Sequence, residues 1–136
     1  QRVIGQFNCL ITAPLQFDST DPVLLENALR RYNGVAIINS VNANTESMES
    51  IFPLMKKYGA YAVALTLDEN GIPKTAEKRL EIAKRLILSA SEFGLSKNRF
   101  LFDPLVLTAS AQQAAVNKTL AGIRLLSETL GVKTTL

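Results

Sequence analysis

The chain has 136 residues, of which 47% are hydrophobic and 20% are charged, a composition typical of one globular unit with a packed core. Its net charge is only +3, and the basic residues are scattered without interleaved aromatic residues, which argues against a nucleic-acid surface. One cysteine, Cys9, indicates a reducing, cytoplasmic compartment, and no apolar run approaches the roughly 18 residues of a membrane helix.

The first predicted unit is a strand followed by a helix. Residues 14–17 form a short strand that runs into the polar segment Asp18-Ser19-Thr20. Asp21 can cap the next helix, and Pro22 suits its first position, where no N–H donor is needed. Apolar residues then recur at helical spacing until Asn33-Gly34, which we expect to end the helix; they are Leu25, Ala28, Leu29 and Tyr32.

The second unit repeats this pattern. Residues 35–38 form a continuous apolar run, typical of a strand covered on both faces, and the run leads into Asn39-Ser40-Val41-Asn42. Pro53 falls inside the following helix, so we expect either a start near Ser50 or a kink at Pro53, and an end at Gly59. The inward residues of this helix are Met48, Ile51, Phe52 and Met55.

The third unit contains the clearest helix. Residues 60–67 form the predicted strand, which ends at Asp68, and Thr75 is the predicted N-cap of a helix that Gly94 closes. The inner face of that helix is expected to be Leu80, Ala83, Leu86, Ile87, Ala90 and Phe93. Basic pairs fall where solvent-facing helix positions are expected, and they are Lys56-Lys57, Lys78-Arg79 and Lys84-Arg85.

The last units follow the same order. Residues 100–102 form a strand that runs into Asp103-Pro104, a helix ends at Gly131, and residues 132–136 begin a fifth strand. Strands that alternate with helices imply a parallel sheet with right-handed crossovers. We interpret residues 1–136 as a single partial domain that is cut at both ends.

Four predicted strands end in a carboxylate or a carboxamide, and these residues are Asp18, Asn39, Asp68 and Asp103. The carboxyl ends of parallel strands share one edge of the sheet, so we expect the four side chains to converge there. Without His, Cys or Lys nearby they are poor zinc ligands. They suit Mg²⁺, or equally a flat heterocycle whose N–H groups donate to the carboxylates.

Each residue also has a structural interpretation. Asp18 could cap the helix that begins at Asp21 or Pro22, although we favour a ligand role. Asn39 could form a loop before Ser40, and here too we favour a ligand role. For Asp68, which precedes Glu69-Asn70-Gly71, we favour the turn. Asp103 precedes Pro104, which forces an extended backbone and aims the side chain outward, so we favour a ligand role.

Four motifs carry a family resemblance. They are Pro14-Leu15-Gln16-Phe17-Asp18-Ser19-Thr20, Ile38-Asn39-Ser40-Val41-Asn42, Leu65-Thr66-Leu67-Asp68-Glu69-Asn70-Gly71-Ile72-Pro73 and Asp103-Pro104-Leu105-Val106-Leu107. In this order and spacing, over residues 14–136, they resemble the methyltetrahydrofolate-binding methyltransferases. That family includes the folate domain of cobalamin-dependent methionine synthase and the methyltetrahydrofolate:corrinoid-protein methyltransferases, and dihydropteroate synthase is a more distant relative with the same barrel.

The resemblance implies an α/β fold of the (β/α)₈ TIM-barrel type, with about half of the barrel, four to five βα units, present. It implies that Asp18, Asn39 and Asp103 hold the pterin ring, with Ser40 and Asp68 as possible secondary contacts and no metal site. The implied substrate is methyltetrahydrofolate. The implied methyl acceptor is cobalamin or another corrinoid, carried by a partner protein or a cobalamin-binding domain.

The family's catalytic Asn follows the segment that matches Thr134-Thr135-Leu136, so its expected position lies beyond Leu136. We therefore expect this stretch alone to be inactive. Two alternatives remain: a non-catalytic half-barrel whose open sheet edges are closed by a second copy in a homodimer, and a dihydropteroate-synthase-like enzyme. The latter would need a Lys and a Ser-x-Arg from the late part of the barrel, and neither of these late-barrel features is available in this stretch.

Overall fold

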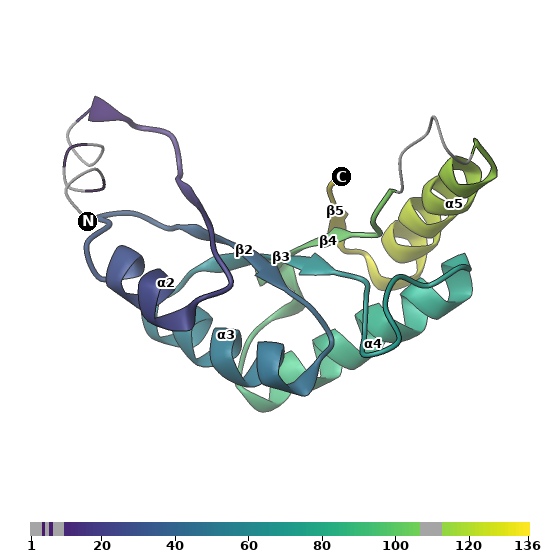
Figure 1. Cartoon of the computed structure of the whole chain (residues 1–136), viewed down its shortest axis with the longest axis horizontal. Coiled ribbons are helices and arrows are strands. Elements are labelled where there is room, and N and C mark those ends of the chain that lie inside the picture. Colours follow the sequence, from purple (N-terminus) through teal and green to yellow (C-terminus); the bar gives the residue numbers. More distant parts are fainter. Residues whose placement is uncertain (1–3, 5, 7–9, 107–112) are drawn as a thin grey trace.

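The computed structural model describes residues 4, 6, 10–106 and 113–136, and Cys9 lies outside them. Its centre is a five-stranded parallel sheet in the order β1-β2-β3-β4-β5 (Figure 1). The strands are β1 (Gln16–Asp18), β2 (Ile37–Val41), β3 (Tyr61–Leu65), β4 (Phe100–Asp103) and β5 (Lys133–Thr134). The helices are α2 (Pro22–Leu29), α3 (Thr45–Tyr58), α4 (Ala76–Glu92), the short 3₁₀ helix η1 (Lys97–Arg99) and α5 (Gln113–Leu130).

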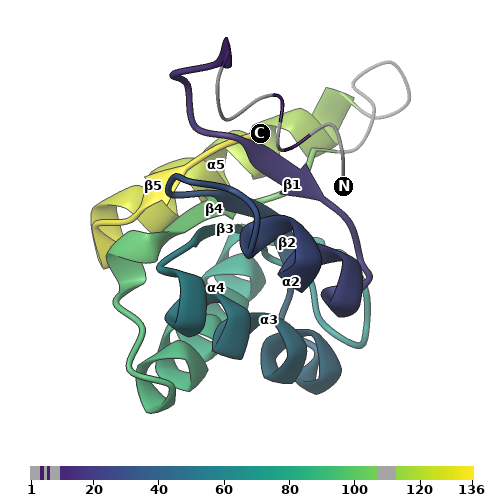
Figure 2. The ribbon, with the colours of Figure 1, turned by 90° about the vertical axis from the view of Figure 1, so that its left-hand side faces the viewer.

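The strand order equals the chain order, so every crossover runs in the same direction across the sheet. Right-handed crossovers of this kind place all helices on one face, as in a β/α barrel rather than a doubly wound sheet. Figure 1 shows α3 and α4 beneath the sheet, with α2 and α5 flanking it, and an opposite face that none of these four helices covers. Figure 2, turned by 90°, shows α2, α3 and α4 on the same side of the strands. The predicted alternation and parallel sheet are confirmed.

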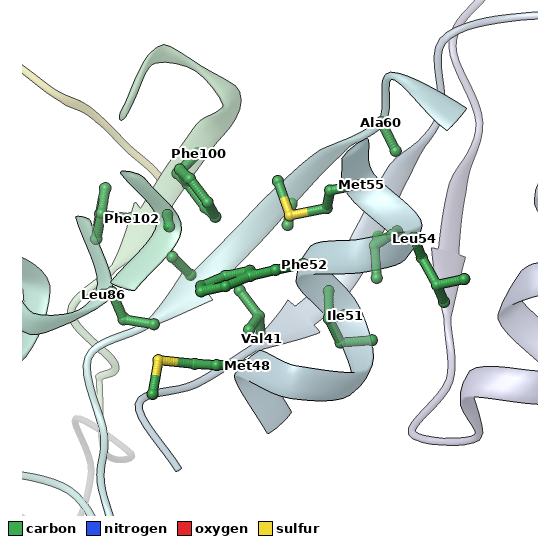
Figure 3. Close-up of a cluster of buried hydrophobic side chains, with 14 of the residues drawn as sticks. Val41, Met48, Ile51, Phe52, Leu54, Met55, Ala60, Leu86, Phe100 and Phe102 are labelled. Atoms are coloured by element: carbon green, nitrogen blue, oxygen red, sulfur yellow. The ribbon is translucent and has the colours of Figure 1, made fainter. Parts of the chain in front are cut away.

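The hydrophobic core fills the space between the sheet and the helices (Figure 3). Phe52 of α3 is fully buried at its centre, and its ring contacts those of Phe93 and Phe100 edge-on, with centroids 5.5 and 5.8 Å apart. The other predicted inward residues of α3 are also buried, namely Met48, Ile51 and Met55. Among the described residues, no helix is long and apolar enough to cross a membrane.

Helix α2 ends at Leu29, earlier than the predicted end at Asn33-Gly34. The N–H of Tyr32 donates to the Leu29 carbonyl three residues back, so the chain tightens and leaves the helix. The Tyr32 ring packs edge-on against Phe17 at 5.7 Å, and its hydroxyl accepts from the Leu15 N–H at 3.2 Å. Tyr32 therefore anchors β1 instead of extending the helix.

Helix α3 begins at Thr45 and continues through Pro53, so of the two alternatives expected there the start near Ser50 is wrong. Proline removes the hydrogen bond to the carbonyl four residues earlier, which belongs to Glu49. Pro53 and Glu49 are both exposed, so water can satisfy that carbonyl. The predicted end is confirmed, because Gly59 closes the helix with a left-handed φ of 65°.

Helix α4 begins after Thr75, whose hydroxyl accepts from the Lys78 N–H at 3.2 Å, as predicted. Its buried face differs from the prediction at Arg79, which was expected to face solvent but is only 4% exposed. Ile82 is also buried on this face. The remaining members of the basic pairs are exposed, as expected; they are Lys56, Lys57, Lys78, Lys84 and Arg85.

An ionic cluster ties α2 to α3. One carboxylate oxygen of Glu26 accepts hydrogen bonds from Lys57 Nζ at 2.7 Å, from the Tyr58 hydroxyl at 3.0 Å and from Arg30 at 3.3 Å. These contacts, of which the Lys57 hydrogen bond is the largest, lower the pKa of Glu26 from 4.5 to about 2. The ionised carboxylate therefore stabilises the folded state.

We expect Glu26→Gln to lower the thermal unfolding temperature at neutral pH. Because the folded-state pKa is depressed, the stabilisation is present above pH 4.5 and is lost as the pH falls towards 2. The difference in unfolding temperature between wild type and variant should therefore become smaller as the pH falls from 4.5 towards 2. Differential scanning calorimetry from pH 7 to pH 3 measures it, with Glu92→Gln, an exposed glutamate near the end of α4, as control. A difference that stays constant with pH would contradict this account.

Candidate functional site

Asp18 and Asn39 lie side by side on neighbouring strands. Asp18, the last residue of β1, is the register partner of Asn39 in β2, and Asn39 Nδ2 donates to Asp18 Oδ2 at 3.3 Å. Asn39 is therefore a strand residue, and the loop interpretation is wrong. The contact uses one of the two amide hydrogens of Asn39, so its second hydrogen and its carbonyl oxygen remain for a ligand.

Asp18 does not cap the following helix, because Asp21 does. Asp21 Oδ1 accepts from the N–H groups of Val23 and Leu24 at 2.9 and 3.2 Å. The Asp18 side chain is exposed, and in the described part of the chain its only hydrogen-bond partner is Asn39. Its carboxylate keeps acceptor capacity.

Asp103 is the last residue of β4 and pairs in register with Leu65 of β3. Its Oδ1 accepts from the Leu105 N–H at 2.7 Å, which closes a small turn around Pro104. Its Oδ2 receives no hydrogen bond from the residues that the structure describes. One carboxylate oxygen is therefore structural, while the other can accept from a ligand.

The three residues share the face of the sheet that the helices leave open. Successive side chains in a strand point to opposite faces, and the residue before each of the three packs towards the helices. These preceding residues are Phe17, Ile38 and Phe102. Asp18, Asn39 and Asp103 therefore lie on the open face, at or near the carboxyl ends of their strands.

The register also fixes their spacing. Asn39 pairs with Val63 and Val63 with Leu101, so Asp103 lies two strands away from Asn39 and two residues further along. With standard strand dimensions this corresponds to roughly 12 Å between Cα atoms. The Asp18–Asn39 pair and Asp103 are thus separated by about this distance on the open face. Among the described residues, no group of three or more His, Cys, Asp or Glu is compact enough to hold a metal ion.

The two secondary candidates, Asp68 and Ser40, lie in different structural environments. Strand β3 ends at Leu65, before the predicted Leu67, and Asp68 lies beyond it in a turn. Asp68 Oδ1 accepts from the Asn70 N–H at 2.9 Å, and its backbone pairs with Gly71, so the turn interpretation is confirmed. Ser40 is half-buried at the register irregularity of β2.

Three buried polar residues near Asp103 were not among the predicted site residues, and one of them is Thr66, whose hydroxyl donates to the Asp103 carbonyl. Arg79 Nε donates to the Pro104 carbonyl at 2.7 Å, and the Thr119 hydroxyl donates to the Leu105 carbonyl at 3.2 Å. A signal for Arg79 exists, because position 79 shares a helical face with Ala83, four residues later. The contact with Pro104, 25 residues away, has no sequence signal.

Comparison with known proteins identifies the family. Residues 2–136 match the family model described as pterin binding enzyme. The chain belongs to this family. The predicted family and barrel-type fold are confirmed.

Two curated relatives of this pterin-binding chain are methyltransferases or methionine synthases. It is 37% identical over 120 residues to methionine synthase from Mycobacterium leprae, and the aligned segment covers 84% of this chain and 10% of that protein. It is 32% identical over 104 residues to methylcorrinoid:tetrahydrofolate methyltransferase from Eubacterium limosum, which covers 75% of this chain and 38% of that protein.

Among solved structures, dihydropteroate synthase from Xanthomonas albilineans in complex with 7,8-dihydropteroate matches with a TM-score of 0.72 at 21% identity. The match covers 97% of this chain and 49% of that one. Dihydropteroate synthase from Vibrio fischeri ES114 matches with a TM-score of 0.64 at 18% identity. These similarities show the fold, and the pterin-binding chain spans about half of that barrel.

Proposed function

We propose that the protein carrying this chain transfers a methyl group between N5 of methyltetrahydrofolate and the cobalt of a corrinoid, and that this chain supplies the pterin-binding face. The observation that carries the proposal is the Asp18–Asn39 pair facing Asp103 across the open face, with acceptor capacity on each. The two relatives named above support a methyl-transfer context, and the name of one contains both a corrinoid and tetrahydrofolate.

The side chains match the edges of a pterin. Carboxylates only accept hydrogen bonds, so Asp18 and Asp103 Oδ2 suit the 2-amino group and the ring N–H groups. Asn39 can donate its second amide hydrogen to a ring carbonyl and accept an N–H with its own oxygen. A charge-assisted grip from two sides fixes the ring plane and therefore the direction of the N5–methyl bond.

The corrinoid supplies the cobalt that accepts or delivers the methyl group, and it is carried by a partner protein or domain. The residues of this chain bind and orient. The methyl–N5 bond breaks readily only if charge developing on N5 is neutralised by a proton or a hydrogen-bond donor. Asp18 and Asp103 are acceptors and do not provide that donor, so their role is in holding the ring.

Dihydropteroate synthesis is the second candidate, and the structural similarity to two such synthases favours it. Those matches lie at 21% and 18% identity, whereas the relatives named methionine synthase and methyltransferase lie at 37% and 32%. Methyl transfer is therefore the better supported function.

The test uses the intact protein with methyltetrahydrofolate and reduced cob(I)alamin, and follows methylcobalamin by absorbance. We expect methylcobalamin to form at a rate that saturates with folate, and methylcobalamin with tetrahydrofolate to give the reverse reaction. Absence of transfer in both directions, together with formation of dihydropteroate, would replace the first function by the second.

A further inference from the structure

The segment after β4 combines a candidate ligand residue with an unusual backbone. Leu105 has a φ of +59°, the left-handed region, which is unfavourable for a residue with a Cβ. Such a conformation persists only where surrounding contacts fix it. It directs the Leu105 N–H to Asp103 Oδ1 at 2.7 Å. The backbone conformation of Leu105 and the orientation of the Asp103 carboxylate are therefore coupled.

Three successive carbonyls of this segment each accept a hydrogen bond from a different part of the fold. The Asp103 carbonyl accepts from the backbone and the hydroxyl of Thr66, which follows β3, at 3.0 and 3.2 Å. The Leu105 carbonyl accepts from Thr119 of α5. The carbonyl between them, that of Pro104, accepts from Arg79 of α4 at 2.7 Å, the shortest of these bonds.

Burying Arg79 at this position costs free energy, because its charged guanidinium is removed from water. It is 4% exposed, and no carboxylate among the described residues forms an ion pair with it. Its Nη1 donates to the Thr75 carbonyl at 3.3 Å, and burial lowers the pKa of the guanidinium from its ordinary value. An apolar side chain of similar volume would fill the space without desolvating a charge. Packing alone therefore does not account for an arginine here.

Helix α5 packs closely against Arg79 and Pro104 at Gly122. A Cβ at Gly122 would lie 3.2 Å from Arg79 Cδ and 3.6 Å from Pro104 Cβ. The missing side chain lets α5 approach the layer formed by Arg79 and Pro104. The guanidinium is thus enclosed between α4, α5 and the segment that carries Asp103.

We propose that Arg79 is a positioning residue that acts through Pro104 and Leu105 to hold the Asp103 carboxylate in the orientation that binds the pterin. This inference rests on the proposed function. The planar guanidinium holds the Pro104 carbonyl by a charge-assisted hydrogen bond. Without it the segment relaxes towards an ordinary backbone, the Leu105 N–H leaves Oδ1, and the carboxylate rotates away from the ligand.

The experiment compares Arg79→Met with Arg85→Met in the intact protein. Both variants remove one arginine from α4, but Arg85 is exposed, and among the described residues its side chain forms hydrogen bonds to Glu69 and none to the segment that carries Asp103. Two quantities are measured: amide hydrogen exchange in peptides covering residues 103–106, and methyltetrahydrofolate affinity by calorimetry. We expect Arg79→Met to speed exchange in this segment and weaken affinity about tenfold, and Arg85→Met to change neither.

A double-mutant cycle with Asp103→Ala separates positioning from general loss of stability. If Arg79 acts through Asp103, adding Arg79→Met to Asp103→Ala weakens binding by less than twofold, whereas independent effects would multiply. If Arg79→Met does not fold, Arg79→Lys carries the same comparison with a smaller loss of about threefold, because lysine keeps one charged donor.

The outcomes distinguish this inference from the function on which it rests. Wild-type protein that binds no methyltetrahydrofolate would overturn the proposed function, and the role of Arg79 with it. Wild-type binding with unchanged affinity in Arg79→Met, or a full tenfold loss in the Asp103→Ala background, would overturn the role of Arg79 alone.

Discussion

Asp103→Asn is expected to weaken methyltetrahydrofolate binding by about 1.5–3 kcal/mol, the range for losing a hydrogen bond to a charged group. The structure assigns separate tasks to the two carboxylate oxygens. Oδ1 holds the Leu105 N–H at 2.7 Å, and Oδ2 is open to a ligand. Asparagine keeps an oxygen for the turn but replaces the other by an NH₂ donor, which faces the N–H groups of the pterin. Calorimetric titration of the intact protein measures the loss.

Asp103→Ala and Asp68→Asn complete the comparison. Alanine removes both oxygens and should weaken binding at least as much as asparagine does. Asp68→Asn changes a carboxylate whose Oδ1 likewise supports a turn, at Asn70, and asparagine can preserve that bond. It should leave affinity within a factor of two. Normal binding by Asp103→Asn with weak binding by Asp103→Ala would make Asp103 a turn residue only.

Phe52→Ala should destabilise the region around β3 and β4 by about 3–5 kcal/mol. The Phe52 side chain is fully buried and contacts two other aromatic rings, so its removal leaves a cavity between α3 and the sheet. Native-state hydrogen exchange reports the opening free energy of each segment independently of the rest of the protein. Amides of β3 and β4 that exchange by global opening should lose protection by this amount.

Leu88→Ala is the control for this substitution. Leu88 lies on α4 and is 66% exposed, so its truncation should change protection by less than about 0.5 kcal/mol. Equal effects of the two variants would mean that neighbouring side chains move into the space left by Phe52, and this would contradict the expected rigid packing.

The fold was largely predictable because its determinants are local. Continuous apolar runs predict the buried strands, and caps such as Asp21 and Thr75 predict the helix starts. The errors occur where tertiary contacts decide. Tyr32 leaves the helical pattern to bind β1, and Pro53 stays inside a helix because its face is exposed.

The candidate site was predictable in part for the same reason. Parallel topology places the ends of strands at one edge, so the positions of Asp18, Asn39 and Asp103 follow from the strand prediction. The same reasoning is wrong for Asp68, because β3 ends at Leu65, three residues before it. The left-handed Leu105 and its bond partners depend on residues distant in the chain, which no local pattern encodes.

The most direct test of the central claim is a crystal structure of the intact protein with methyltetrahydrofolate. We expect the pterin on the open face of the sheet, with its N–H groups about 2.7–3.2 Å from Asp103 Oδ2 and from Asp18 or Asn39. The N5-methyl group should point away from the strands, towards the space where a corrinoid can approach. A pterin bound elsewhere, or bound on this face without contact to any of the three residues, would contradict the account.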